Sequence, residues 1–418
     1  MLMIRILELK DAGVLLRRRS ACWREAERTV KPILEAVRRH GDRALLQYAR
    51  RLDGLERRSV RVPLRESRRA AGKMSRPLRR AIAIASENIR AYARIQLPRD
   101  FTLELRPGLR LGQVVRPLDA IAAYVPAGRH ALPSTLLMTV IPAQVAGVRR
   151  ICVASPKPAE SILGAASILG ADEIFLMGGA HAIAAFAYGT ETVPRVDRIV
   201  GPGNIYVAAA KKLLAGEVGI DFVAGPTEIL ILAEDGNARI LAADMLAQAE
   251  HDADASAVLL TTSNTLARAV AAELARQLLT LPTAAVAARA IARNSAIVRV
   301  RSMEEGIKFA NQLAPEHLSI PARSFLKKIR SAGCVFIGPH SPEAAGDYAS
   351  GTNHVLPTNG VARLRGGLST ADFVKVISVQ QLDRSALEDL APAILTLARA
   401  EGLEAHARSV EARIHESS

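Results

Sequence analysis

Apolar residues recur at helical spacing through much of the first hundred positions. In residues 30–52, Ile33, Leu34 and Val37 fall on one side of a helix, and Gly41 interrupts the pattern once. Comparable patterns return later in the chain. Four stretches are therefore predicted as helices: residues 30–52, 76–97, 238–250 and, interrupted at Pro392 and Gly402, residues 385–414.

From about residue 110 the pattern changes to short runs rich in branched apolar residues, which are separated by Ala- and Leu-rich stretches of helical length. This alternation is typical of parallel strands joined by helices, so it predicts an α/β fold. Six runs are predicted as strands: residues 150–154, 173–177, 228–233, 257–261, 296–300 and 334–338.

The composition indicates a globular protein with an aliphatic core. The 418 residues are 49% hydrophobic but only 4% aromatic, and the length favours two or three domains. No apolar run reaches the ~18 residues of a membrane span, and the charged amino end is unlike a secretory signal. The cysteines, Cys22, Cys152 and Cys334, are too far apart for a disulfide framework or a cysteine zinc site. We therefore expect a cytoplasmic protein with no membrane partner.

The net charge of +15 comes from the first hundred residues, which hold 26 Lys and Arg against 11 Asp and Glu. One interpretation is a set of solvated helix faces, and the other is a surface that binds polyanions. Proteins that recognise specific nucleic-acid sequences usually also have stacking aromatic residues or a known binding module, and neither is present. The solvated faces are favoured, and no specific nucleic-acid partner is expected. Binding that persists near physiological salt would contradict this interpretation.

Two pairs of polar residues could carry chemistry. Gln248 and His251 are three positions apart at the end of a predicted helix, so they share one face. They could hold a metal or simply form a polar helix end. Glu316 and His317 follow Pro315 and are flanked by apolar residues. A carboxylate beside an imidazole suits acid/base catalysis, but a charged first turn of a helix fits the same spacing.

Residues 346–357 interleave glycines and other small residues with Asp347 and His354, which is difficult to explain by packing and favours a functional loop. The glycine turns at residues 178–181, 201–204 and 224–228 do not form a dinucleotide-binding fingerprint. Near the carboxyl end, Glu401 and His406 taken alone indicate a solvated helix face. Cys334 lies in an apolar run that predicts a buried strand, so we do not expect it to be a reactive thiolate.

Three motifs in this order give the chain a resemblance to the histidinol dehydrogenases. They are Gln248-Ala-Glu-His251, Pro315-Glu316-His317-Leu318 and the segment from Gly346-Asp347 to Asn353-His354. The resemblance extends from Gly41-Asp-Arg-Ala-Leu45 to His406, and it includes Tyr124-Val-Pro126, Gly201-Pro-Gly-Asn204 and Ala224-Gly-Pro-Thr-Glu228.

The resemblance implies oxidation of L-histidinol to L-histidine through L-histidinaldehyde, with reduction of two NAD, in the last steps of histidine biosynthesis. Glu316 is implied to activate water and His317 to take the hydroxyl proton. One zinc ion per subunit is implied, with the ligands Gln248, His251, Asp347 and His406. The substrate contacts implied besides these ligands and His317 are Thr227, His354 and Glu401, and the cofactor contacts are Tyr124, His181 and Asn204.

Two positions on the cofactor side depart from the family pattern. His181 stands where glutamine is usual, and Ala127-Gly128 stands where two glycines are common. A histidine can replace an amide as a donor, but its charge then depends on pH. An enzyme of the same design acting on another polar alcohol is therefore the alternative.

The implied fold consists of two incomplete Rossmann-like domains, similar to those of aldehyde dehydrogenases, with small helical segments at both termini. Residues 1–124 and 229–372 are expected to form one discontinuous domain, and residues 125–228 the inserted second domain. Residues 373–418 are expected to form a helical dimerisation segment. The resemblance also implies a homodimer with shared active sites, in which His406 and Glu401 reach the partner's site.

Overall fold

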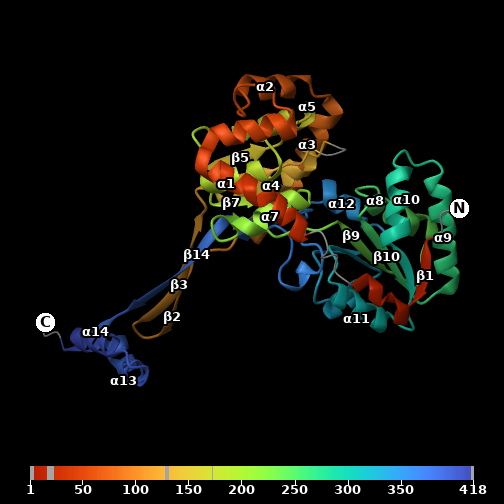
Figure 1. Cartoon of the computed structure of the whole chain (residues 1–418). Coiled ribbons are helices and arrows are strands. Elements are labelled where there is room, and N and C mark those ends of the chain that lie inside the picture. Colours follow the sequence, from red (N-terminus) through yellow and green to blue (C-terminus); the bar gives the residue numbers. More distant parts are fainter. Residues whose placement is uncertain (1–3, 17–22, 128–130, 172, 416–418) are drawn as a thin grey trace.

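A computed structural model describes residues 4–16, 23–127, 131–171 and 173–415. It has two α/β bodies and a long arm that projects from them (Figure 1). The α/β class predicted from the sequence is confirmed. Cys22 and Gly128 lie outside the described residues. Within the described residues, no helix combines the length and the apolar character that crossing a membrane requires.

The first body is built on a six-stranded, wholly parallel sheet with the order β1-β11-β10-β9-β12-β13. Alternate residues of β9 face opposite layers, with Ile229 and Ile231 on one side and Leu230 and Leu232 on the other. Helices α8, α9 and α10 cover the first side, and η1 and α11 cover the second. The strands are β1 (Arg5–Glu8), β9 (Glu228–Leu232), β10 (Ser256–Thr261), β11 (Ala296–Arg299), β12 (His317–Ile320) and β13 (Cys334–Ile337). The helices are η1 (Leu9–Leu16), α8 (Ala238–Ala249), α9 (Asn264–Leu278), α10 (Ala284–Asn294) and α11 (Met303–Leu313).

The second body is built on a five-stranded parallel sheet with the order β6-β5-β4-β7-β8. Helices α1, α6 and α7 pack on one face, and α3, α4 and α5 pack on the other. The strands are β4 (Ala120–Tyr124), β5 (Arg150–Ala154), β6 (Glu173–Phe175), β7 (Arg198–Val200) and β8 (Gly219–Ile220). The helices are α1 (Trp23–Tyr48), α2 (Leu64–Lys73), α3 (Arg76–Gln96), α4 (Pro133–Ala146), α5 (Glu160–Ile168), α6 (Gly179–Tyr188) and α7 (Ile205–Leu214).

Residues 1–124 were expected to belong to a single domain together with residues 229–372, but the structure divides their strands between the two parallel sheets. β1 joins the six-stranded sheet as expected, but β4 pairs with β5 and β7 in the other sheet. The reason is apolar burial. The stripe on α1 that includes Val30 and Val37 belongs to the same core cluster as α6, α7 and Ala122 of β4. Most of the amino-terminal region therefore completes the second body instead of the first.

The six predicted strands and four predicted helical stretches are all present. Gly41 interrupts α1 with a positive φ of 49°, and a π-helical turn (Ala49–Asp53) follows that helix. Gly402, with φ 75°, separates α13 (Arg384–Ala400) from α14 (Glu404–Ile414). Pro392 lies within α13 and does not end it. The short helix α12 (Glu343–Tyr348) follows β13.

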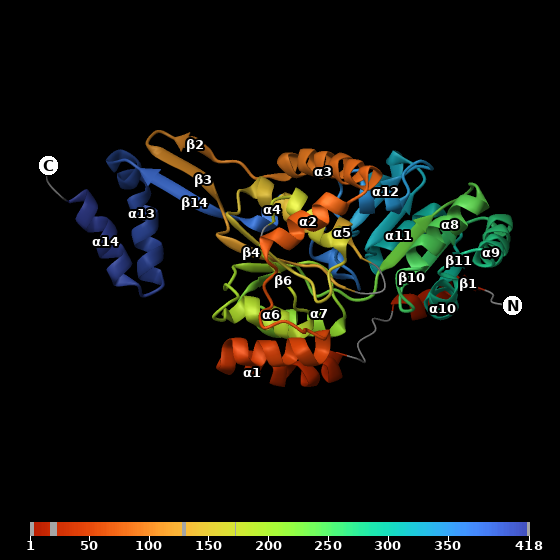
Figure 2. The same cartoon turned by 90° about the horizontal axis from the view of Figure 1, so that it is seen from above.

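The arm is a three-stranded antiparallel sheet with the order β14-β3-β2, and it carries α13 and α14 at its far end (Figure 2). Its strands are β2 (Phe101–Arg106), β3 (Leu109–Pro117) and β14 (Val374–Leu382). The expected helical segment at residues 373–418 therefore begins with a nine-residue strand. Large apolar side chains on the arm are exposed, including Phe101, Leu103, Leu105, Val376 and Ile377.

Candidate active site

Glu316 and His317 lie at the amino end of β12, between β9 and β13. They begin a strand, so the interpretation of this motif as a helix start is wrong. Glu316 Oε2 accepts hydrogen bonds from Thr227 Oγ1 at 2.5 Å and from the backbone N–H of Glu228 at 2.9 Å. His317 Nδ1 lies 3.2 Å from the carbonyl oxygen of Glu228. Since a carbonyl only accepts, Nδ1 carries the proton and donates it. The turn before β9 therefore fixes both side chains.

Asp347 and His354 join this pair from α12 and the loop after it. His317 Nε2 lies 3.5 Å from Asp347 Oδ1. His354 Nδ1 lies 2.9 Å from the Asp347 carbonyl oxygen, and its Nε2 lies 3.2 Å from Thr135 Oγ1 in α4. Because Thr135 belongs to the second body, His354 links the two bodies at the site. The functional loop predicted at residues 346–357 is thus placed beside the acid/base pair.

Gln248 reaches the same cluster from α8, and its side chain is almost completely buried. Its amide lies 2.5 Å from Thr227 Oγ1. With the amide nitrogen facing Glu343, that nitrogen donates to the two carboxylate oxygens at 2.9 and 3.1 Å. The amide oxygen then accepts from the Glu228 N–H at 3.1 Å. Sequence reasoning missed Glu343, although it lies four positions before Asp347 in α12, on the same helix face.

The cluster is rich in buried carboxyl groups. Burial raises the pKa of Glu316, and it raises the pKa of Glu343 to about 8. Burial also opposes the charged form of His317, but Glu316, Asp347 and Glu343 outweigh it and raise the pKa of His317 to about 10. Burial likewise opposes ionisation of Asp347, yet the adjacent imidazole of His317 and the charges of other nearby histidines hold the pKa of Asp347 below its usual value. The charge of each of these side chains therefore depends on the charges of the others.

The predicted zinc ligands are only partly brought together in one chain. His251 lies just beyond the end of α8, and its charge acts on Asp347 and His354. His406 lies in α14 and Glu401 caps the end of α13, so both are on the arm, far from α8 and α12 (Figures 1 and 2). Across the residues that the structure describes, no group of three or more His, Cys, Asp or Glu side chains is arranged to hold a metal ion.

The predicted cofactor contacts follow three strands of the second body. Tyr124 ends β4, and its hydroxyl oxygen accepts from the Gly179 N–H at 3.2 Å, while burial raises its pKa to about 12. Asn204 caps α7 by accepting from two backbone N–H groups at 3.1 Å. His181 is completely buried in α6, where its Nε2 lies 2.7 Å from Asp53 Oδ2. Asp53, which sequence reasoning also missed, accepts from the Gly178 N–H as well.

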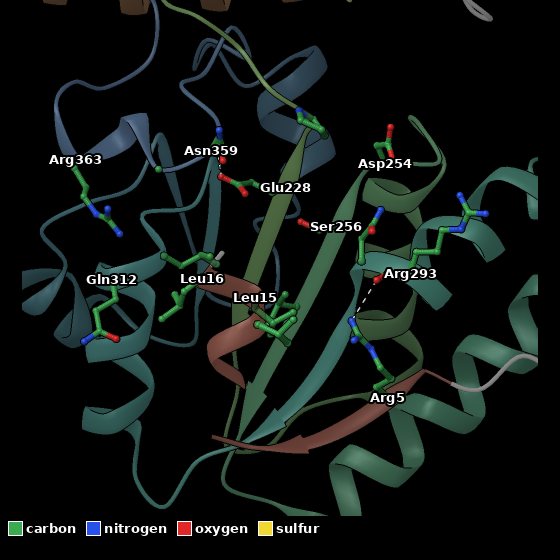
Figure 3. A pocket seen from close by; sticks show the side chains of 16 residues that line it. Arg5, Leu15, Leu16, Glu228, Asp254, Ser256, Arg293, Gln312, Asn359 and Arg363 are labelled. Carbon is green, nitrogen blue, oxygen red and sulfur yellow. Dashed lines mark hydrogen bonds between the residues drawn. The ribbon is translucent and has the colours of Figure 1, made fainter. Parts of the chain in front are cut away.

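A cavity of about 270 Å³ lies next to the acid/base pair, at the amino ends of β9 and β10 (Figure 3). Glu228 lies between the cavity and the acid/base pair. Its backbone contacts Glu316 and His317, whereas its carboxylate lines the cavity and accepts from the Asn359 N–H at 3.0 Å. None of the described lining residues is a site residue predicted from the sequence.

Comparison with known proteins identifies the family. The family model for histidinol dehydrogenase matches residues 16–414. The chain belongs to the histidinol dehydrogenase family. It is therefore a dehydrogenase, and the resemblance noted in the sequence is confirmed.

Individual family members are similar over nearly their full length. A histidinol dehydrogenase from Thermus thermophilus is 51% identical over 393 residues, covering 93% of this chain and 94% of that protein. One from Halalkalibacterium halodurans is 45% identical, covering 99% of this chain and 100% of that protein. The crystal structure of histidinol dehydrogenase from Elizabethkingia anophelis has a TM-score of 0.93 at 36% identity, over 98% of each chain.

The fold is also found outside the histidinol dehydrogenases. An acetylating aldehyde dehydrogenase from Geobacillus thermoglucosidasius has a TM-score of 0.50 at 13% identity, covering 88% of this chain and 96% of that one. This similarity concerns the fold alone, and it confirms the predicted likeness to aldehyde dehydrogenases.

Proposed function

We propose that the chain oxidises L-histidinol to L-histidine through L-histidinaldehyde, with reduction of two NAD, as a cytoplasmic enzyme of histidine biosynthesis. The observation that carries this proposal is the buried pair of Glu316 and His317, with Asp347 and Gln248 beside it, in a chain of the histidinol dehydrogenase family. A carboxylate and an imidazole that both contact the same bound substrate can act as the acid/base groups of two successive oxidations.

The residues present fit a zinc site. Gln248 and Asp347 offer oxygen donors and His251 offers nitrogen, which zinc accepts without thiolate. His317 Nε2 is buried and makes no hydrogen bond, so an unsatisfied polar atom faces this position. We propose one zinc per subunit, held by these three residues and by His406 of the partner. Bound there, zinc would orient the amine and imidazole of the substrate, which gives its catalytic effect through positioning.

The hydrogen bonds of the acid/base pair suggest separate roles. Because Nδ1 of His317 donates to the Glu228 carbonyl, Nε2 carries the lone pair of the neutral ring, and in that form it is the atom that takes the hydroxyl proton of the substrate. Both hydrogen bonds to Glu316 use its Oε2, so we assign Oε1 to the water that attacks the aldehyde. Thr227 and His354, which border the pair, are proposed to contact the substrate.

We propose that NAD binds at the carboxyl ends of β4, β6 and β7, where it accepts the hydride in each oxidation. Tyr124 and Asn204 lie at these ends, beside the turns at residues 178–179 and 201–203. Ligands in open α/β sheets commonly bind at this edge. His181 lies in the wall of this region, where Asp53 holds its Nε2, whereas its Nδ1 makes no hydrogen bond and is the atom that we assign to the cofactor contact.

The arm supports a homodimer with shared sites. Phe101, Leu103 and Leu105 alternate along β2 and are each more than half exposed in the single chain. A second copy is the occupant that we propose for this surface, because it would also bring the exposed Glu401 and His406 to a site that lacks them. The interface would be the same on both subunits, as two-fold symmetry requires.

A steady-state assay that follows reduced nicotinamide tests the activity. The zinc-loaded protein should convert L-histidinol with formation of two reduced nicotinamides for each L-histidine. Conversion of another polar alcohol, with no turnover of L-histidinol, would favour the alternative instead. We retain this second candidate because His181, which stands where the family usually has glutamine, pairs with Asp53 on the cofactor side.

A further inference from the structure

We propose that Asp53 determines the choice between NAD and NADP, by binding the 2′-hydroxyl of the adenosine ribose and repelling the 2′-phosphate of NADP. This inference rests on the cofactor site proposed above, and it adds a residue that none of the sequence motifs includes. Asp53 is the last residue of the π-helical turn that follows α1, and its side chain is 10% exposed. It therefore lies in the wall of the cofactor region and still reaches its surface.

The two oxygens of the Asp53 carboxylate have different surroundings. Oδ2 accepts from the Gly178 N–H at 2.8 Å and lies 2.7 Å from His181 Nε2. Oδ1 makes no hydrogen bond to any residue that the structure describes, and it is not among the polar atoms that are buried without a partner. By contrast, Asp221, which follows β8 at the same edge of the sheet, has both oxygens engaged within the protein. Oδ1 of Asp53 is thus an accessible acceptor that is left for a ligand.

Asp53 lies where the far end of the cofactor is expected. Gly178 follows β6 at the carboxyl edge of the sheet, and the strand order places β6 two strands from β4. Thr135, in the first turn of the helix after β4, contacts His354 beside the acid/base pair, so the nicotinamide that accepts the hydride is expected near the end of β4. Adjacent strands are about 4.8 Å apart, which puts the end of β6 about 10 Å away. The adenosine ribose, in the other half of NAD, is the part that reaches this far.

The charges around Asp53 make it the group that decides between the two cofactors. The Arg51 guanidinium lies 5.0 Å from the centre of the Tyr48 ring, and Lys157 Nζ lies 3.4 Å from the position that a Cβ on Gly54 would occupy. Without the carboxylate, these two cations would favour a 2′-phosphate. A carboxylate on the ribose hydroxyl is a common means by which dinucleotide-binding folds select NAD. Its charge also rejects a second anion at the same position.

Equilibrium binding of NAD and of NADP to the full-length protein, measured by calorimetry without an alcohol substrate, tests this role. The unsubstituted protein should bind NAD at least about 10-fold more tightly than NADP. Asp53→Asn keeps an oxygen in the Oδ2 position and places a donor at Oδ1, so it should lower this preference by about 10-fold or more. An unchanged preference in a folded Asp53→Asn variant would overturn the proposal.

Asp42→Asn is the matched control. Asp42 accepts from Thr190 and Thr192, which lie just beyond the carboxyl end of α6, whereas Asp53 contacts the amino end of that ten-residue helix. The helix separates the two carboxylates by about 15 Å. Because an exposed charge at that distance is largely screened, Asp42→Asn should change the preference by less than about 2-fold.

A cofactor without the hydroxyl gives a second readout that needs no stable variant. NAD that lacks the adenosine 2′-hydroxyl should bind the unsubstituted protein about 10-fold more weakly than NAD. In Asp53→Ala the two ligands should bind nearly alike, because the acceptor is gone. If the deoxy cofactor binds the unsubstituted protein as tightly as NAD does, this proposal is wrong and the NAD site stands. Failure of the unsubstituted protein to bind NAD would instead reject the cofactor of the proposed function, and this proposal with it.

Discussion

At the scale of single residues, hydrogen bonds give Glu316 and His317 different surroundings although they are neighbours in sequence. Glu316 faces Thr227 and a backbone N–H, whereas His317 is held by a carbonyl and directs Nε2 toward Asp347. We expect Glu316→Gln to slow the oxidation of supplied L-histidinaldehyde by about 10²- to 10⁴-fold, with a much smaller effect on the first hydride transfer. Pre-steady-state measurement of reduced nicotinamide formation from each substrate checks this.

His317→Asn provides the complementary experiment. It should slow the first oxidation, because the base that takes the hydroxyl proton is lost. Raising the pH should recover part of the rate, since hydroxide can then replace the missing base. If both variants slow both oxidations to the same extent, the division of labour between the two residues is wrong.

The thiols of Cys152 and Cys334 are expected to be unreactive. Burial raises the pKa of Cys334 to about 11 and that of Cys152 to about 12. At pH 7.5 a thiol with pKa 11 is ionised in only about one molecule in 3,000, and the thiolate is the nucleophile. In a Cys22→Ser background, iodoacetamide should therefore modify neither residue in the native protein within an hour, as mass spectrometry would show.

Activity gives an independent check on Cys334. Cys334→Ala should retain at least half of the kcat for L-histidinol, because the proposed chemistry contains no thioester. Complete inactivity in a folded Cys334→Ala variant would contradict the assignment of the chemistry to Glu316 and His317.

The residues that the sequence could reveal are those in unusual local patterns. The Glu316–His317 pair and the polar loop around Asp347 stand out against apolar neighbours, so they could be predicted. Glu343 and Asp53 could not, because a glutamate at a helix start and an aspartate after a helix are ordinary surface features in sequence. Only the fold shows that Glu343 is buried and that both residues accept hydrogen bonds from functional segments.

At the scale of elements, a buried ion pair joins α7 to the residue that follows β8, and the same lysine also contacts the turn before α7. Lys211 Nζ lies 2.7 Å from Asp221 Oδ1 and 2.6 Å from the Gly201 carbonyl oxygen, while Asp221 Oδ2 accepts from the Gly201 N–H. Both side chains are at most 3% exposed. Lys211→Met should lower the free energy of unfolding by about 3–5 kcal/mol, because it leaves the Asp221 carboxylate buried without its counter-ion.

Lys212 is the matched control for this experiment. It is the next residue of α7 and also pairs with a carboxylate, Glu27, but its side chain is half exposed. Lys212→Met should cost about 0–1 kcal/mol. Urea unfolding followed by circular dichroism measures both variants. Equal losses for the two lysines would show that the burial of the Lys211 pair has no particular importance.

The elements were predictable where their apolar faces are buried within one chain. The strands that were predicted in the two parallel sheets are nearly continuous apolar runs, as strands covered on both faces are. The arm was missed for the opposite reason. Its strand β14 pairs with β3 across more than 250 residues, and alternate apolar residues of β2 such as Leu103 and Leu105 are exposed in the single chain. Helix α1 was predicted, but which sheet it covers depends on tertiary packing that periodicity does not specify.

At the scale of the whole molecule, the position of the arm determines which active site Glu401 and His406 can reach. β3 and β14 carry α13 and α14 away from both bodies, so Glu401 and His406 lie far from Asp347 of the same chain (Figure 1). If the arm exchanges between two subunits, each site contains residues of both chains. Variants with lesions on opposite sides of this boundary should then complement each other.

The experiment mixes Asp347→Ala and His406→Ala, each inactive alone, by unfolding and refolding them together. In a mixed dimer one site loses both residues, while the other keeps an intact Asp347 from one chain and an intact His406 from its partner. Random association makes about half of the dimers mixed, each with one working site, so about a quarter of the unsubstituted activity should return. The control pair, Asp347→Ala with Gln248→Ala, has both lesions in the same half-site and should recover nothing. If mixed dimers are demonstrated by mass and the first pair stays inactive, His406 does not act across the dimer.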